Sequence, residues 1–398
     1  MRRPTLLLAL VLTACGGDVS AVLPPPGPEP RAVAVIDADG QLGLVADGAV
    51  TNEYFKFTAR PALDASTAVL YTSGTGTGRT WVSWASLPDG RRVGGLEMSG
   101  VLEATATSLD GELAAFVNVA DPSPAGTIAG ARATSRIVAA SPTDGIVYEV
   151  ALDGNFVPEA FGRATRPDGT PSQIFLLEYL PAEAPERYRV RVLDTSTGEL
   201  SFPLNLRTKT DLVDQEMAGY TRSQVVSADD GLLFTLYIGT DGMPDGHPHA
   251  FVHTLDFADG VWCLVPDDRL DLAHVPGALA VGGDRLYVAS ANGWIGSFRI
   301  PAILDVEREP IMDWSVQVHD GIAGAPVLTA DDDGATIAYG NRLIEVADDG
   351  RVTAESVLPG PITAMSATGD MIGDDWTTFG ELDRPDWLST VTHLFVAT

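Results

Sequence analysis

The chain has 398 residues, of which 54 are Asp or Glu and 25 are Lys or Arg, and its formal net charge is −29. Binding to nucleic-acid phosphates requires dense Lys and Arg, so no nucleic-acid partner is expected. Two cysteines are too few for a disulfide scaffold or for a zinc site built from cysteines. Because 45% of the residues are hydrophobic, most of the chain can bury a core and global disorder is not expected.

The N-terminus predicts export and membrane anchoring. Two arginines precede an uncharged, mostly apolar stretch at 4–14, which is too short to cross a bilayer of about 30 Å as a helix. The stretch ends in LTAC, whose last residue is Cys15. This ending resembles the lipobox of bacterial lipoproteins. The resemblance implies a signal peptide at 1–14, cleavage before Cys15, and acylation of Cys15 with lipid chains such as palmitate. The alternative is an ordinary signal peptide in which Cys15 is incidental.

Acylation at Cys15 would place the protein outside the cytoplasm, on a membrane. Several acyl chains together make an effectively permanent anchor, whereas one chain alone binds only marginally. Gly16 occupies the position where an Asp would signal retention in the inner membrane, so the outer membrane is favoured in a bacterium that has two. Five prolines make 15–30 a semi-rigid tether. The remaining residues, 31–398, form the body.

The body reads as short strands separated by turns, without convincing helical periodicity. It contains fourteen Asp-Gly dipeptides, a strong hairpin signal between alternating apolar runs. The turns recur with a period near 45 residues, which is typical of a repeat architecture. Six units share one plan of four strands, and they lie at Ala62–Met98, Leu102–Val150, Phe161–Leu204, Ser223–Pro266, Pro276–Val318 and Gly324–Leu358.

These units resemble the blades of a known class of β-propeller. A Ser and an Asp-Gly turn are followed by an apolar strand at Ser108–Leu113 and at Ser227–Leu232. This pattern resembles the bacterial propellers of the TolB/WD40-like and YVTN-type groups. The resemblance implies an all-β propeller of seven four-stranded blades. The seventh blade would join 362–398 to 32–45, so that both termini close the ring and remove exposed sheet edges. Two β-sandwiches are the competing architecture.

The densest group of candidate binding residues follows one strand of the fourth unit. Half of the six histidines fall within seven residues there. His247 and His249 would lie about 7 Å apart on one strand face, within reach of one metal ion, whereas His249 and His253 would lie about 13 Å apart. A carboxylate from this segment would complete such a site. The candidate loop therefore comprises Asp241, Asp245, His247, His249 and His253. The alternative is a polar loop with His253 partly buried against the next blade.

Other motif searches yield no catalytic residues and no predicted cofactor. The chain has no G-x-S-x-G elbow, no H-E-x-x-H motif and no Walker loop. Asp331, Asp332 and Asp333 offer oxygen ligands that Ca²⁺ or another divalent metal would accept, but they lie where every unit has a turn, so a plain turn is favoured. Cys263 lies in an apolar strand and is interpreted as a buried, inert thiol.

Three functions remain open at this stage, and the third of them is a calcium-stabilised structural protein of the envelope. The first is a lipid-anchored propeller that binds an envelope protein or polymer as a scaffold. Its binding face would be formed by the loops between second and third strands, at 74–79, 119–134, 181–187 and 240–248. The second is a lactonase-like propeller hydrolase with a metal in the central channel, for which the inner strands offer few ligands. Fold alone does not decide between them.

Overall fold

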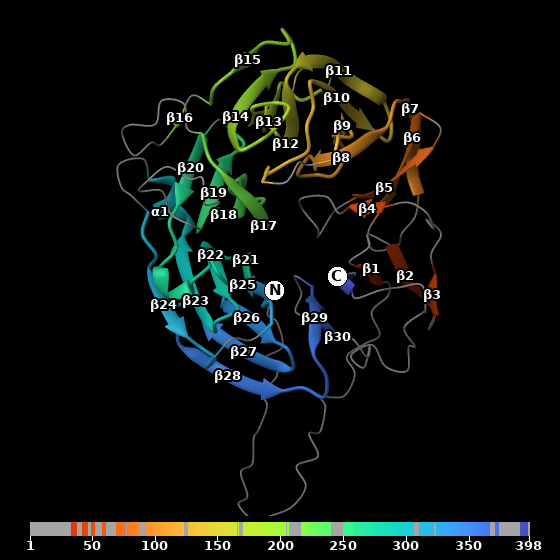
Figure 1. Cartoon of the computed structure of the whole chain (residues 1–398). Helices are drawn as coiled ribbons and strands as arrows, with labels where there is room; N and C mark the ends of the chain where they lie inside the picture. The colour runs from red at the N-terminus through yellow and green to blue at the C-terminus, as the bar shows by residue number, and fades with distance from the viewer. Residues whose placement is uncertain are drawn as a thin grey trace, which may run out of the picture. The chain divides into compact units, whose positions relative to one another are not determined.

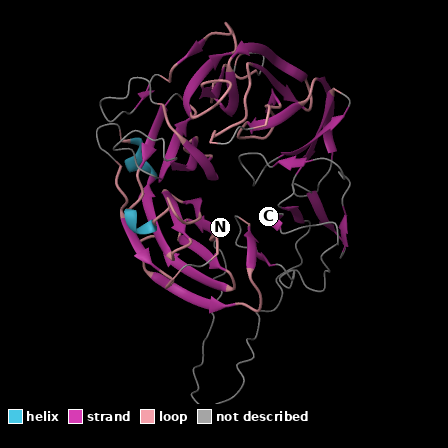
Figure 2. Cartoon of the chain, viewed as in Figure 1, coloured by secondary structure: helices cyan, strands magenta, loops and turns pink. Residues whose placement is uncertain are grey.

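The computed structural model shows an almost purely β body (Figure 1). The chain separates into two units, Met1–Pro30 and Arg31–Thr398, and all described residues belong to the second. The structure describes 33–396 except 38–41, 47–48, 52–57, 61–68, 77, 87–91, 123–125, 165, 167–169, 204, 207–215, 240–249, 259, 306–309, 322–323, 367–370 and 374–390. Helix in the described part is confined to α1 (Ile300–Leu304) and the 3-10 turn η1 (Asp268–Leu270), drawn in cyan in Figure 2.

Three antiparallel sheets of four strands come first along the body. The sheet that holds both ends of the body comprises β31 (Val391–Val396), β1 (Val33–Asp37), β2 (Leu42–Ala46) and β3 (Ala49–Thr51). The next comprises β4 (Thr58–Arg60), β5 (Val69–Gly76), β6 (Arg79–Ser86) and β7 (Arg92–Ser99). The third comprises β8 (Leu102–Thr107), β9 (Ala114–Asn118), β10 (Thr134–Ser141) and β11 (Gly145–Asp153).

Four further sheets follow the same plan. One comprises β12 (Asn155–Phe161), β13 (Gln173–Leu180), β14 (Arg187–Asp194) and β15 (Leu200–Ser201). The next comprises β17 (Gly219–Ser227), β18 (Leu232–Gly239), β19 (Ala250–Asp256) and β20 (Gly260–Leu264), with β16 (Asn205–Leu206) added in parallel to β20. The last two comprise β21 (Gly277–Gly282), β22 (Arg285–Ser290), β23 (Trp294–Arg299) and β24 (Trp314–Gln317), and then β25 (Val327–Asp331), β26 (Gly334–Tyr339), β27 (Arg342–Ala347) and β28 (Val352–Val357).

The sheets pack face to face in chain order, and this makes the body a β-propeller. Separate apolar clusters fill successive interfaces from the β4–β7 sheet to the β25–β28 sheet. First strands of consecutive sheets lie next to one another, as β8 does to β12, β17 to β21 and β21 to β25. A sheet that lies between two others is covered on both sides, so the inner strands are apolar on both faces. Their apolar residues therefore recur in short runs rather than in simple alternation.

Seven sheets have four or five strands, which matches the seven blades predicted. The predicted closure between the ends of the body is also present, because β31 pairs antiparallel with β1. One detail differs from the prediction. β29 (Ile362–Met365) and β30 (Met371–Gly373) do not join that sheet but form a two-stranded sheet of their own. β29 lies between β25 and β31, where a first strand belongs.

Strand direction divides the connections between two faces. Since neighbouring strands are antiparallel, connections from first to second and from third to fourth strands share one face, which we call the turn face. Asp-Gly turns at 110–111, 144–145 and 230–231 lie there. Connections from second to third strands and from one sheet to the next emerge on the opposite face, which we call the loop face. The described residues of 119–133 and the segment 181–186 belong to it.

One predicted strand boundary was wrong. The unit that starts at Phe161 in the sequence analysis has its first strand earlier, at Asn155–Phe161. The Pro158 in this strand masked the signal, because proline is rare in paired strands, and the ladder shifts register between Pro158 and Ala160. The channel-side strand therefore carries Asn155 and Glu159.

Candidate functional site

Most of the predicted loop lies outside the described residues. This applies to Asp241, Asp245, His247 and His249, and also to the predicted lipidation site Cys15. His253 is described, and it does not reach a surface. It lies in β19 with 2% of its area exposed, packed at the interface with the preceding sheet. His253 is thus buried in an interface between two sheets, more deeply than the alternative of a partly buried residue expected.

The described part of the loop face is tied together by backbone hydrogen bonds across three consecutive sheets. Gly100 N donates to Gly78 O at 2.8 Å, and Val119 N donates to Val101 O at 3.1 Å. The connection 119–133 then reaches the connection 181–186 of the next sheet, where Ile128 N donates to Pro185 O at 2.8 Å. We call this set of residues the loop rim. It comprises Gly78, Gly100, Val101, the described residues of 119–133 and 181–186, and the flanking Trp81 and Tyr220.

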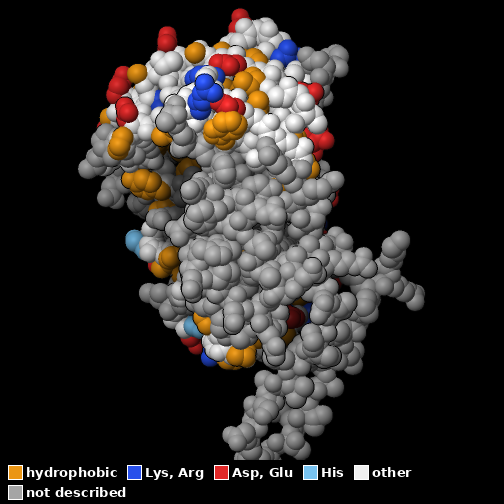
Figure 3. All heavy atoms as spheres, turned by 90° about the vertical axis from the view of Figure 1, so that its right-hand side faces the viewer, with side chains coloured by type: hydrophobic (Ala, Val, Ile, Leu, Met, Phe, Trp, Pro, Cys, Tyr) orange, Lys and Arg blue, Asp and Glu red, His pale blue; other side chains and the backbone are white. Residues whose placement is uncertain are grey.

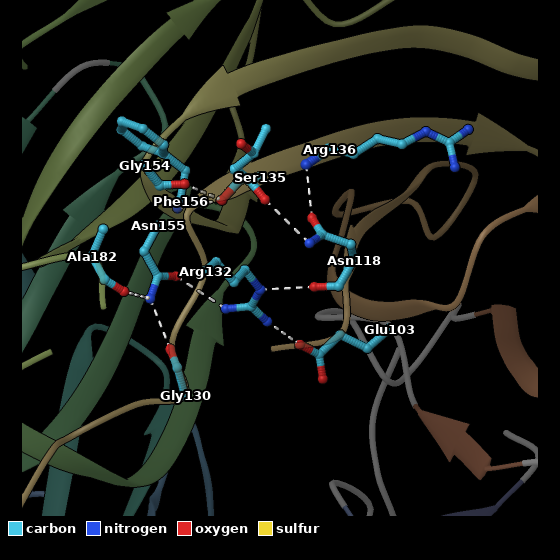
Figure 4. A network of polar contacts seen from close by, with 11 residues as sticks. Glu103, Asn118, Gly130, Arg132, Ser135, Arg136, Gly154, Asn155, Phe156 and Ala182 are labelled. Carbon is cyan, nitrogen blue, oxygen red and sulfur yellow. Dashed lines mark hydrogen bonds and ion pairs between the residues drawn. The ribbon is translucent and has the colours of Figure 1, made fainter. Parts of the chain in front are cut away.

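A buried arginine fixes the loop rim to the sheets (Figure 4). Arg132 Nε donates to the carbonyl oxygen of Asn118 at 2.7 Å, and Nη1 donates to Asn155 Oδ1 at 3.1 Å. Its Nη2 forms an ion pair with Glu103 of β8. All three nitrogens of the guanidinium are therefore bonded, although only 5% of the side chain is exposed. Burial lowers the pKa of Arg132, and the Glu103 carboxylate partly offsets that effect.

Asn155 extends the network to the neighbouring loop. Its Nδ2 donates to Gly130 O at 2.7 Å and to Ala182 O at 3.3 Å, so one amide joins both connections of the loop rim. Arg132 N adds a bond to Ala182 O at 3.2 Å. Figure 4 shows these groups converging from β8, β9, β12 and the two connections. The loop rim is therefore pre-organised rather than dependent on a partner for its shape.

The loop rim also carries exposed apolar side chains. Trp81, Val101, Val119 and Tyr220 have 51%, 40%, 48% and 42% of their area exposed. Tyr220 Oη donates to Thr127 O at 3.4 Å, which holds its ring beside the 119–133 connection. In the view of Figure 3, turned by 90° from Figure 1, the described hydrophobic, basic and acidic side chains are interspersed rather than gathered in one patch. Exposed aromatic side chains such as those of Trp81 and Tyr220 are typical of protein–protein contacts.

The channel side offers fewer chemical groups. Gln224 of β17 donates to Glu159 Oε1 of β12 at 2.8 Å and to Thr235 Oγ1 at 3.1 Å. Burial raises the pKa of Tyr179 above the range of ordinary phenols, and Glu159 adds to the effect. Within the part of the chain that the structure describes, no three His, Cys, Asp or Glu residues are grouped as metal ligands. No described helix has the length and apolar character needed to span a membrane.

Residues Asp331–Asp333 form the turn that connects β25 to β26. Asp331 Oδ1 accepts hydrogen bonds from Asp333 N at 2.9 Å and from Gly334 N at 3.2 Å. Cys263 lies in β20 and is only partly buried, whereas the sequence interpretation expected a buried thiol.

Sequence reasoning missed Arg132 and Asn155. Arg132 follows a run of Gly and Ala in a loop, and no motif distinguishes it from the other arginines. Its partners lie 14, 23 and 29 positions away, so only the packing of two sheets brings them together. A single Asn at the start of a strand likewise carries no signal by itself.

Comparisons with known proteins find no matching family model and no matching curated protein. Among solved structures, BamB from Moraxella catarrhalis is 14% identical, with 84% of this chain and 89% of that chain covered and a TM-score of 0.41. The Dos1 propeller is 10% identical over 83% of this chain and 81% of its own, with a TM-score of 0.45. The dihydro-heme d1 dehydrogenase NirN is 13% identical over 94% of this chain and 78% of its own, with a TM-score of 0.45.

Proposed function

We propose that this β-propeller is a binding module that docks a protein of the cell envelope on its loop rim, while Cys15 anchors it to a membrane by acylation. The observation that carries the proposal is the combination of a rigid frame with exposed apolar residues. The frame is the hydrogen-bonded set of connections around Arg132, and the exposed residues include Trp81 and Tyr220.

Rigidity matters because association costs entropy when loops must be ordered on binding. Connections that are already fixed avoid that cost, so more of the contact energy appears as affinity. Aromatic residues supply much of the binding energy in protein interfaces, and Trp and Tyr are over-represented among the residues that dominate it. Trp81 is the most exposed aromatic residue in the described part of the chain.

The membrane anchor supports the same function. A chain with a formal net charge of −29 is repelled by anionic lipid headgroups, so contact between body and membrane does not hold the protein in place. The Pro-rich segment after Cys15 would space the body from the membrane and leave the loop rim free for a partner. The outer membrane is the expected location in a bacterium with two membranes.

The test is crosslinking in cells that express the tagged full chain, followed by mass spectrometry. The test variant combines Trp81→Ala with Tyr220→Ala. The matched control combines Val93→Ala with Ile146→Ala, two residues about 40% exposed near the turn face. We expect one stoichiometric partner with the wild type and the control, and at least a tenfold loss of it with the test variant. Equal recovery from all three chains would refute the loop rim as the binding surface. A Cys15→Ser chain tests the anchor separately, and its release from the membrane fraction is the expected result.

A further inference from the structure

The interface between the β12–β15 sheet and the β17–β20 sheet contains an unusual group of side chains. It is otherwise apolar, with phenylalanine, leucine and valine from both sheets. Into this core project Cys263 of β20, His253 of β19 and Met217, which lies in the connection between the two sheets. The group thus brings a thiol, an imidazole and a thioether to one blade interface.

The two sulfur atoms are joined by a hydrogen bond. Cys263 Sγ donates to Met217 Sδ at 3.7 Å. Two sulfur ligands, each about 2.3 Å from one tetrahedrally coordinated metal ion, lie about 3.8 Å apart. The observed separation therefore already suits two ligands of one ion. Met217 is also held firmly, because its N and O exchange two backbone hydrogen bonds of 2.7 Å with Tyr188. These bonds fix the Met217 backbone beside β14.

His253 supplies the third group. It stands directly opposite Cys263 in the β19–β20 ladder, a position in which facing side chains have Cβ atoms about 5 Å apart. Its Nε2 is buried and has no hydrogen-bond partner among the described residues. Such a buried nitrogen without a partner is costly, and it calls for a specific explanation. The ring lies 6.2 Å from the Tyr188 ring and 5.9 Å from the Tyr237 ring, which leaves the imidazole among aromatic walls.

From this geometry we propose that the interface binds one soft monovalent metal ion, Cu(I), through Cys263 Sγ, Met217 Sδ and His253 Nε2. Thiolate and thioether ligands select Cu(I) over harder cations, and a neutral imidazole suits it as well. On binding, the Cys263 thiol releases its proton to solvent, and the hydrogen bond from Cys263 Sγ to Met217 Sδ is replaced by a bond from each sulfur to the metal. The metal remains Cu(I) throughout.

The net charge of the metal complex favours Cu(I) over Zn²⁺ at this site. Cu(I) and one thiolate form a neutral pair, which an apolar interface tolerates. Zn²⁺ with the same ligands would leave one positive charge buried without a partner, at high cost. The described walls of the site next to His253 are the rings of Tyr188 and Tyr237, and a phenol ring offers no negative charge to compensate.

The experiment uses the full chain with Cys15→Ser, so that Cys263 is its one thiol. Under anaerobic conditions, Cu(I) is offered as its coloured complex with bicinchoninate, and the loss of colour measures transfer to the protein. We expect one equivalent of Cu(I) to be withdrawn. Cys263→Ser should lower the affinity roughly 100-fold, and Met217→Leu and His253→Leu roughly tenfold or more. Met98→Leu, which changes another fully buried methionine in the β4–β7 sheet, should bind like the parent chain.

Two results would overturn the proposal. One is failure of the parent chain to withdraw Cu(I), and the other is binding by Cys263→Ser that equals the parent. A second measurement does not depend on any variant's folding. Iodoacetamide alkylation of Cys263 is followed by mass spectrometry with and without one equivalent of Cu(I). Protection of the thiol by at least tenfold supports the site, and equal alkylation rates contradict it. Neither measurement depends on a partner at the loop rim.

Discussion

The two interfaces that flank the β12–β15 sheet bury polar side chains in different ways. On one side, Arg132 places all three guanidinium nitrogens against oxygen acceptors from β8, β9 and β12. On the other side, His253 keeps Nε2 without a partner among aromatic rings. The first interface buries a charged group and supplies its hydrogen-bond partners. The second buries a neutral base and supplies no hydrogen-bond partner for its Nε2 among the described residues.

This difference indicates a different role for each of the two buried polar residues. A fully bonded cation fixes the relative positions of the groups it touches, because every displacement breaks a charge-assisted hydrogen bond. An unsatisfied imidazole fixes nothing and costs stability, so its presence is better explained by an occupant than by architecture. The Arg132 interface is therefore interpreted as structural support for the loop rim, and the His253 interface as a site.

The strongest test of the comparison removes the arginine. Arg132→Met retains the apolar stem but leaves the Asn118 carbonyl and the Asn155 amide oxygen without their donor. We expect the free energy of unfolding to fall by about 3 kcal/mol, measured by urea denaturation at pH 7. Arg136→Met, which disrupts a more exposed pair with Glu149, is the control and should cost about 1 kcal/mol or less. A cost for Arg132→Met no greater than that of the control would contradict the assigned role.

The second test uses acid on the His253 interface. Burial lowers the pKa of His253 from 6.5 to about 4, so the folded state resists protonation that the unfolded chain accepts. Stability contributed by the neutral ring is fully present above pH 6.5 and is lost as pH falls toward 4, up to about 3 kcal/mol. His253→Leu should abolish this loss. At pH 4.5 the variant should lose about 2 kcal/mol less than the wild type does, relative to pH 7.5.

The control for the acid test is His274→Leu, since His274 is largely exposed. It should retain the wild-type dependence of unfolding free energy on pH. If His253→Leu and the wild type lose the same stability between pH 7.5 and 4.5, then the interpretation of His253 as a neutral buried base is incorrect.

A smaller effect is expected from the hydroxyl that links β10 to the start of β12. Ser135 Oγ donates to Gly154 O at 2.8 Å and accepts from Phe156 N at 2.7 Å. Ser135→Ala should cost about 1–2 kcal/mol of unfolding free energy, because the Phe156 N–H loses its acceptor. Thr80 makes the same two bonds one sheet earlier, to Gly100 O and from Leu102 N, so Thr80→Val should cost a similar amount. Thermal denaturation of both variants measures this, and a neutral Ser135→Ala would show that the bond is dispensable.

The repeated strands could be predicted because their signals are local. Asp-Gly turns and short apolar runs recur within each unit, and the six units found in the sequence each overlap most of one sheet of the structure. The pairing of β31 with β1 was also predictable, since a closed ring requires it. The separate β29–β30 sheet and the true start of β12 were not predictable. The first depends on how many sheets fit around the ring, and the second was masked by Pro158.

The candidate site residues, in contrast to the strands, could not be predicted from local signals in the sequence. Clustering in the sequence pointed to His253 as part of an exposed loop, whereas the structure buries it in a blade interface. Arg132, Asn155 and Met217 carried no sequence signal. Their roles depend on partners in other strands and in connections from different sheets, and a spacing rule along the chain does not detect such partners.

The sequence by itself determined the β-propeller plan, because turn chemistry and strand pattern act between near neighbours and repeat in every unit. It also contained the predicted lipidation signal at Cys15, which stays a prediction. Only the tertiary structure decided which polar residues meet. Arg132 meets Glu103 and Asn155, and Met217 meets Cys263, because adjacent sheets pack face to face. Packing between sheets is cooperative and long-range, so these contacts follow from the fold rather than from any one segment.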